Sequence, residues 1–245
     1  MSKILFIVEG KSGEPKVVRP LTELLGPEYE IAVVGYPIYD LYQKLKNEKQ
    51  YGDVVAFLRS EGKLPNLQKG VLSSEAFSAI YLVFDYDPQD INYSDSDLRD
   101  LLELFNNETE LGKLYINYPM VEAVYDIHSY SDDGYLERTV QLQGLTSRSY
   151  KRLVKGNTCF DLHGDIDFRD LCYALKLNYA KVQQLTSHEL DDGSYREVLN
   201  LQIAKKNKES VFYVLATILL LALDYNKSRT LEIVDRTLAS SANQH

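Results

Sequence analysis

The chain has 245 residues, of which 44% are hydrophobic and 26% charged, and this composition is typical of a globular protein with one or two domains. Its formal net charge of −9 argues against binding nucleic acid over a broad basic surface, because phosphate contacts need Lys and Arg side chains. Its two cysteines, which lack metal-ligand spacing, argue against a disulfide framework and predict a reducing, cytoplasmic location. The most apolar run, Val211–Leu223, is too short to span a bilayer, so we predict a buried helix there and no membrane contact.

The first 128 residues alternate between predicted strands and predicted helices. Apolar, β-branched runs predict the strands, whereas amphipathic spacing and helix-start residues predict the helices between them. The predicted strands are Lys3–Val8, Ile31–Gly35, Ala79–Phe84 and Leu114–Asn117, and the predicted helices are Glu14–Leu25, Tyr39–Leu45, Gly52–Arg59, Ser94–Asn106 and Pro119–Ile127, with a loop over Gly62–Gly70 and a short helix capped by Ser73 or Ser74. Helices between consecutive strands predict a parallel sheet with right-handed crossovers.

Residues 129–245 follow a different pattern, which predicts a mostly helical extension. A polar linker is predicted at Ser129–Gly134. The helices predicted beyond it are Ser147–Lys155, Phe168–Gln184, Tyr195–Lys206, Ser210–Leu223 and Ser228–Ala239. We therefore predict an α/β fold with a parallel sheet flanked by helices over residues 1–128, and a helical extension over residues 129–245 packed on or beside it.

Acidic residues follow two of the predicted strands at the point where each strand ends. Glu9 comes directly after the first strand, and Asp85 and Asp87 follow the strand Ala79–Phe84. Ligands of open α/β sheets bind beyond the carboxyl ends of the strands, so we expect these three carboxylates at one rim. Several carboxylates at one rim need a compensating positive charge, and Mg²⁺ is commonly held by one or two carboxylates together with phosphate oxygens.

The order and placement of these motifs resemble the TOPRIM fold, which is shared by topoisomerase and primase catalytic domains, OLD-family nucleases and small defence-associated proteins. The likeness is greatest to the RloB-like branch, whose first motif, Glu-Gly-x-x-x-Glu-Pro, is present as Glu9–Pro15. The Asp-x-Asp motif is present as Asp85–Asp87. An Asn-Pro-x-x-Glu motif is present as Asn117–Glu122, with one residue inserted between Asn and Pro. The resemblance covers about the first half of the chain.

The resemblance implies a nuclease that depends on Mg²⁺ or Mn²⁺, uses two ions, and cleaves phosphodiester bonds of RNA or DNA. It also implies a role in antiviral defence, under the control of a partner such as an ATPase. Glu9, Asp85 and Asp87 would hold the metal, and Glu9 is also the candidate to accept a proton from the attacking water. Glu14 and Glu122 would be outer ligands or would orient Lys11. Lys11 would contact a substrate phosphate, and Arg19 is a weaker candidate for the same role.

Several alternatives stay open at this stage. Glu14 and Glu122 also suit the start of any helix, and Asp87 followed by Pro88 also signals a plain turn. A phosphoacceptor receiver domain places acids at strand ends too, but it normally has paired acids after its first strand. A non-catalytic acidic subunit of a larger defence or ATPase complex, or a homo-oligomer, also fits the net charge. The basic residues suited to a phosphate backbone are Lys205, Lys206 and Lys208, together with Lys151, Arg152 and Lys155, and His128 is predicted to be structural.

Overall fold

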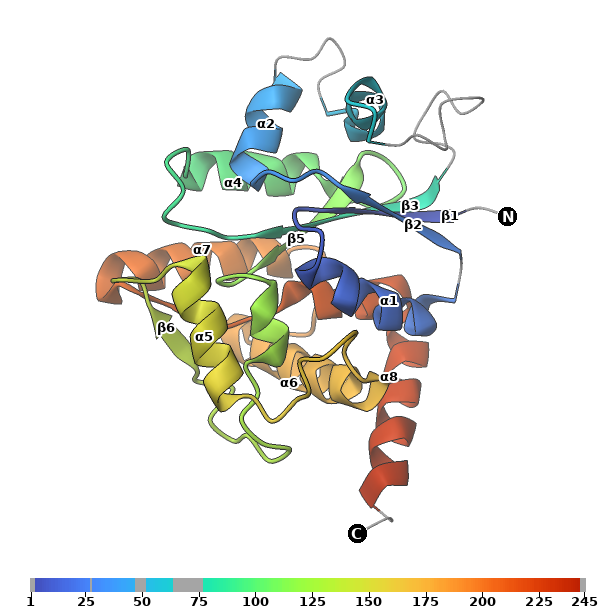
Figure 1. Ribbon diagram of the computed structural model, residues 1–245, viewed down its shortest axis with the longest axis vertical. Helices are drawn as coiled ribbons and strands as arrows, with labels where there is room; N and C mark the ends of the chain where they lie inside the picture. Colours follow the sequence, from blue (N-terminus) through green and yellow to red (C-terminus); the bar gives the residue numbers. More distant parts are fainter. Residues whose placement is uncertain (1–2, 27, 47–51, 64–76, 243–245) are drawn as a thin grey trace.

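A five-stranded sheet lies at the centre of the molecule. We describe it from a computed structural model, which describes residues 3–26, 28–46, 52–63 and 77–242. The strand order is β2-β1-β3-β5-β4 (Figure 1). Neighbouring strands are parallel except for β4, which runs antiparallel to β5 at the edge. The strands are β1 (Lys3–Val8), β2 (Tyr29–Val33), β3 (Phe77–Asp85), β4 (Asn106–Asn107) and β5 (Gly112–Asn117).

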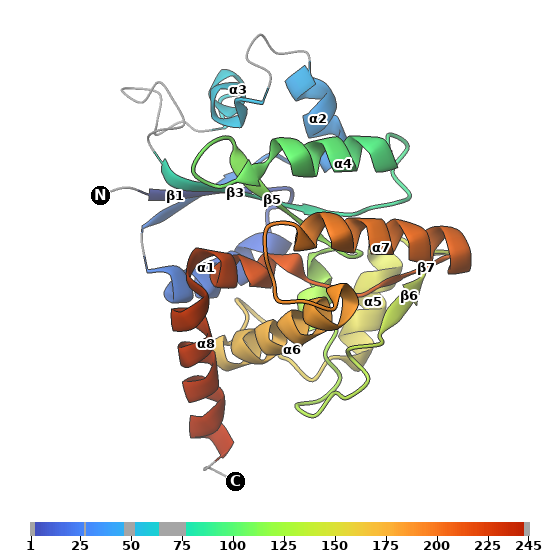
Figure 2. The same cartoon turned by 180° about the vertical axis from the view of Figure 1, so that it is seen from behind.

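Helices cover both faces of this sheet. Helices α2 (Ile38–Lys46), α3 (Val54–Ser60) and α4 (Asp95–Leu104) lie on one face, and α1 (Gly13–Leu25) lies on the other (Figures 1 and 2). Burial on both faces explains why the strands are continuous apolar runs rather than alternating ones. Residues 4–8 of β1, for example, are fully buried. The predicted α/β class, with a mostly parallel sheet between helices, is confirmed.

The connections that leave β1 and β3 diverge at their carboxyl ends. Helix α1 leads from β1 to β2, whereas β3 pairs with the other side of β1. Helix α4, which follows β3, lies on the opposite face of the sheet from α1 (Figure 1). In open α/β sheets, ligands bind beyond the strand ends where the strand order reverses in this way.

The C-terminal half packs against α1 and β5 and shares one hydrophobic core with the sheet. A second, two-stranded antiparallel sheet joins the start of this half to a strand near its end. None of the helices in the described ranges is long and apolar enough to cross a bilayer. The elements of this half are β6 (Thr139–Gln141), α5 (Ser147–Asn157), α6 (Phe168–Thr186), α7 (Ser194–Glu209), β7 (Val211–Tyr213), the 3₁₀ helix η4 (Thr217–Leu220) and α8 (Leu221–Ala242).

Two predictions for the C-terminal half are wrong. The run Ser210–Leu223 is not one helix, because it contains β7 and η4 before α8 begins. Phe212 pairs with Val140 of β6, and a short apolar run cannot be assigned to strand or helix from periodicity alone. The segment Ser129–Gly134 is not a free linker, because Asp132 within it is buried and accepts hydrogen bonds from Arg138.

Smaller differences occur in the first half. Strand β2 begins at Tyr29 rather than Ile31, because its pairing with β1 starts there. The helix predicted over Pro119–Ile127 is instead the short 3₁₀ helix η3 (Val121–Tyr125), since Tyr118 is held in an extended bridge to Leu215. The predicted short helix at Ser73 or Ser74 lies outside the described residues, as does most of the predicted loop, residues 64–70.

Candidate functional site

Five carboxylates, which we call the acid cluster, gather at the carboxyl ends of β1 and β3. Glu9 follows β1, Asp85 ends β3 and Asp87 lies just beyond it, while Glu14 is in the first turn of α1 and Glu122 is in η3. Asp85 is central, because burial raises its pKa well above the usual value and the charges of all four other members raise it further. The structure therefore brings together the acidic residues that the sequence placed at strand ends.

Burial and mutual repulsion raise the pKa of most of the acid cluster. Burial raises the pKa of Glu9 to about 8, and the charges of Asp87 and Glu14 add to the rise. Burial is also the main cause of the raised pKa values of Glu14 and Asp87. These directions mean that the negative charge of the cluster is not balanced by the residues around it.

Backbone groups orient two of these carboxylates. The N–H of Gly10 donates to Glu14 Oε1 at 3.0 Å, and the N–H of Val121 donates to Asp85 Oδ1 at 2.8 Å. A Cβ atom at Gly10 would lie 2.9 Å from Glu14 Oε2, so any larger residue at this position would displace the Glu14 carboxylate. Asp87 adopts a φ of 33°, a left-handed conformation that Asp tolerates better than most residues.

Two carboxylate oxygens of the acid cluster, Glu9 Oε2 and Glu122 Oε2, are buried without a hydrogen-bond partner in the part of the chain that the structure describes. Such atoms are costly to bury, and carboxylate oxygens are the ligands that Mg²⁺ and Mn²⁺ take. Within the described ranges, no three His, Cys, Asp or Glu side chains already surround one point as metal ligands. These carboxylates are therefore the right type of ligand for a hard divalent cation. Their side chains have to rotate before they can surround one.

A cleft of about 310 Å³, which we call the lysine cleft, lies beside the acid cluster. Its cations are Lys16 from α1 and Lys151 and Lys155 from α5. Lys151 Nζ lies 3.1 Å from Glu122 Oε1, and its charge offsets part of the rise in the pKa of Glu14 and Asp87. Residues Ser12, Gly13, Glu122, Tyr125, Val154 and Leu162 complete the lining. Helix α5 of the C-terminal half thus contributes directly to the site.

Lys11 and Arg19, both predicted to meet phosphate, differ in their surroundings. Lys11 is exposed and forms no ion pair with the described residues, so its phosphate contact stays a prediction. Arg19 forms an ion pair with Asp165, with Nη1 and Oδ1 2.5 Å apart, and so ties α1 to the loop before α6. Asn117 is buried and its Oδ1 accepts a hydrogen bond from the backbone N–H of Ile218, which ties β5 to η4.

Of the other basic candidates, on α7, Lys205 and Lys206 are used within the fold, whereas Lys208 is exposed. Lys205 pairs with Glu209 at 2.7 Å, and Lys206 pairs with Asp95 at 3.0 Å. A larger cavity, of about 680 Å³, lies at the amino end of β5. Lys113 lines it but already pairs with two Asp side chains, at 2.8 and 2.9 Å, so its charge is balanced there.

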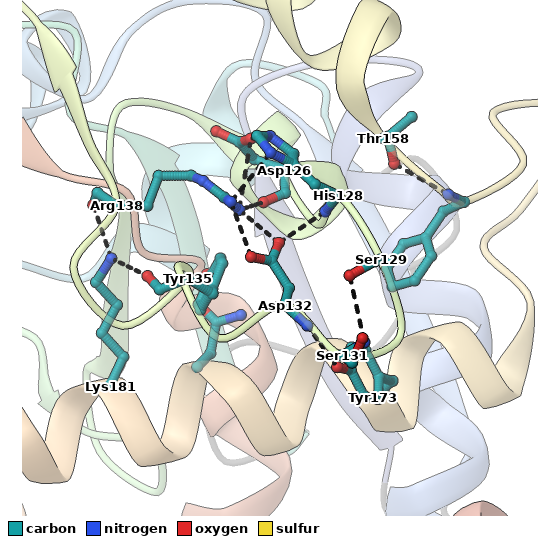
Figure 3. Close-up of polar contacts among 12 residues, drawn as sticks. Asp126, His128, Ser129, Ser131, Asp132, Tyr135, Arg138, Thr158, Tyr173 and Lys181 are labelled. Carbon is teal, nitrogen blue, oxygen red and sulfur yellow. Dashed lines mark hydrogen bonds and ion pairs between the residues drawn. The ribbon is translucent and has the colours of Figure 1, made fainter.

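A second group of buried acids, the Arg138 network, lies beside α6, the helix that carries Tyr173 and Lys181 (Figure 3). Arg138 donates from both Nη atoms to the Asp132 carboxylate, at 2.8 and 2.9 Å, and from Nη1 to the backbone oxygen of Asp126 at 2.6 Å. Asp126 accepts from Tyr150 Oη at 2.9 Å, and its Oδ1 lies 3.0 Å from His128 Nε2. His128 therefore belongs to this network and not to the acid cluster.

The Arg138 network balances its own charge. Burial tends to raise the pKa of Asp132, but the hydrogen bonds from Arg138 and from the His128 backbone prevail and lower it. Lys181 of α6 is fully buried beside the network and donates to the backbone oxygens of Tyr135 and Arg138, both at 2.8 Å (Figure 3). Burial and, to a smaller extent, the charge of Arg138 lower the pKa of Lys181 to about 7.

Sequence reasoning did not single out Lys16 and Tyr125, and it grouped Lys151 and Lys155 with the lysines of α7. The spacing of Lys151 and Lys155 is i, i+4, which indicates one shared helix face. No sequence signal places that face against Glu122, because the contact joins segments 29 residues apart through the packing of α5 on η3.

Comparison with protein-family models, with curated proteins and with solved structures gives no match to this chain. The function must therefore be argued from the chemistry of the acid cluster and of the lysine cleft.

Proposed function

We propose that the protein is a metal-dependent nuclease of the TOPRIM type that hydrolyses phosphodiester bonds of RNA or DNA. The observation that carries this proposal is the acid cluster at the divergence of β1 and β3, with two buried carboxylate oxygens that lack partners. The TOPRIM assignment is supported by the motif order, with Glu9 after β1 and Asp85 and Asp87 after the neighbouring strand β3.

In this proposal Glu9, Asp85 and Asp87 would hold Mg²⁺ or Mn²⁺, and Glu122 would be an outer ligand. Two such ions, when bound, would stabilise the attacking and leaving oxygens of an in-line displacement and make water a better nucleophile. The role of Glu9 would be to accept a proton from the attacking water, which its Oε2 can do because it has no hydrogen-bond partner among the described residues. Glu14 orients the glycine turn through its bond to Gly10, and the exposed Lys11 on that turn contacts a substrate phosphate.

The biological setting is proposed from the sequence resemblance. It comprises a cytoplasmic role in antiviral defence, control by a partner such as an ATPase, and assembly into a homo-oligomer. The net charge of −9 supports a protein partner with a basic surface.

The test is a Mg²⁺ titration with labelled tRNA, single-stranded DNA and plasmid as substrates. We expect cleavage by the wild type to rise with Mg²⁺, and to fall about 10²- to 10⁴-fold in Glu9→Gln and Asp85→Asn, because each loses a carboxylate oxygen needed for proton transfer or metal binding. Asp133→Asn is the matched control, since Asp133 is exposed and lies outside the acid cluster. Equal behaviour of all four proteins would favour the alternative, a non-catalytic acidic subunit of a larger complex.

A further inference from the structure

The lysine cleft gathers positive charge in a protein whose formal net charge is −9. Lys151 is partly neutralised by Glu122, at 3.1 Å. Lys16 and Lys155 form no ion pair with the described residues, and the nearest recorded partner of Lys16 Nζ is the backbone oxygen of Leu162 at 3.5 Å. Cations that converge on a cleft without matching carboxylates suit an anionic ligand.

Apolar side chains and two polar groups without a hydrogen-bond partner among the described residues, Glu122 Oε2 and the Tyr125 hydroxyl, also line the cleft. Tyr125, Val154 and Leu162 line it between the lysines. Tyr125 is only 7% exposed, and its hydroxyl is buried with no hydrogen-bond partner among the described residues. A buried hydroxyl without a partner is unfavourable, so a ligand that offers it a hydrogen bond gains affinity. The ligand that suits this cleft therefore combines an anion with a flat or apolar part.

We propose that the lysine cleft binds one nucleotide of a single-stranded nucleic acid, next to the phosphate that is cleaved at the acid cluster. This inference rests on the proposed function, because Glu122 lines the cleft and belongs to the acid cluster. Lys16 and Lys155 neutralise the phosphate of the bound nucleotide, and its base packs on Tyr125 and Val154. The substrate strand thus runs between α1 and α5.

The size and lining of the cleft favour a single strand over a duplex. A volume of about 310 Å³ lies at the lower end of the range for pockets that hold small ligands, which suits one nucleotide. The bases of a duplex are stacked and paired within the double helix, so they cannot reach the apolar lining of the cleft. A base of a single strand can lie against an aromatic side chain. A duplex would contact only the rim of the cleft.

The experiment measures binding without cleavage, with Ca²⁺ in place of Mg²⁺. Fluorescence anisotropy follows labelled oligothymidylate, oligouridylate and a duplex of equal length, over a range of salt concentrations. We expect the wild type to prefer the single strands. In Lys16→Gln/Lys155→Gln we expect affinity to fall at least about tenfold, and the slope of log affinity against log salt to shrink by about 0.7 for each lysine removed.

The matched control is Lys44→Gln/Lys176→Gln, which removes the same charge from α2 and α6, outside the cleft. Equal affinity and salt slope in both double variants would overturn the proposal, and so would binding of the duplex as tight as that of the single strands, or no binding of any probe. A wild type that cleaves with Mg²⁺ while the cleft variant binds normally would refute the cleft and leave the nuclease standing. Weak binding by the cleft variant, with no cleavage by any protein, would support the cleft and refute the nuclease.

Discussion

The acid cluster and the Arg138 network both bury carboxylates, but they balance the charge in opposite ways. In the Arg138 network a guanidinium group holds Asp132 at 2.8 Å, and hydrogen bonds lower the pKa of that residue. In the acid cluster, Lys151 is the one cation among the described residues that forms an ion pair with any of the five carboxylates, and its side chain is 56% exposed. Burial there raises the pKa of Glu9 to about 8.

This difference separates a structural role from a functional one. A buried charge that is paired and hydrogen-bonded is stable in the folded protein without any ligand. A buried group of like charges without partners destabilises the fold, and such groups are typical of sites that bind a cation or perform proton transfer. The direction of the carboxylate pKa shifts therefore distinguishes the two regions, downward for Asp132 and upward for Glu9 and Asp85.

Replacement of Arg138 should have the largest effect on stability. Arg138→Met leaves Asp126 and Asp132 buried without their cation, and we expect the free energy of unfolding to fall by about 3–5 kcal/mol. Urea denaturation measures this change. Arg196→Met is the control, since its ion pair with Glu103 is exposed and should contribute at most about 1 kcal/mol. A similar loss in both variants would contradict the structural role of the Arg138 network.

Replacement of Glu9 should stabilise the metal-free protein at high pH, the opposite of the effect expected for Arg138. The pKa of Glu9 is higher in the folded than in the unfolded protein, so titration of Glu9 should lower metal-free stability as the pH rises from about 4.5 to about 8, and this one group contributes at most about 1.4 kcal/mol per pH unit. Glu9→Gln should flatten this dependence and be more stable than the wild type at pH 8. Thermal unfolding at pH 5 and pH 8 measures both effects.

Added Mg²⁺ tests the same difference between the acid cluster and the Arg138 network. Because the wild type is expected to bind the ion at pH 8, it should gain about 2.7 kcal/mol when the free ion reaches a hundred times its Kd. The gain should be smaller in Glu9→Gln, and smaller for the wild type at pH 5, where protons compete for the carboxylates. If Mg²⁺ does not change the stability of the wild type at pH 8, this result would argue against a metal site in the acid cluster.

Replacement of Lys181 should have the smallest effect, which is a change in the pH dependence of stability rather than a loss of stability. Its folded pKa of about 7 lies below that of an unfolded lysine, so the unfolded state binds more protons above pH 7 and stability should rise with pH there. We expect a contribution of about 1 kcal/mol per pH unit between pH 7.5 and 9. Lys181→Met should remove it, and Lys176→Met, at an exposed position of α6, should not. An unchanged slope in Lys181→Met would show that Lys181 stays protonated when folded.

The placement of Glu9, Asp85 and Asp87 could be predicted because it depends on local features. The apolar runs of β1 and β3 end where their hydrophobic residues end, and helices between parallel strands put the carboxyl ends of those strands at one edge. The strand β7 could not be predicted, because its apolar residues satisfy both a strand and a buried helix. Its pairing with β6, 70 residues earlier, decides between them.

The sequence by itself thus determined the α/β class, the strands β1 and β3, and the end of the sheet at which the acids lie. Only the tertiary structure decided that Lys151 of the distant helix α5 lies against Glu122, and that Arg138 binds the Asp132 carboxylate. The physical reason is that periodicity and turn chemistry act over a few neighbouring residues, whereas charge balance in a buried site depends on which remote side chains the packing brings within a few ångströms.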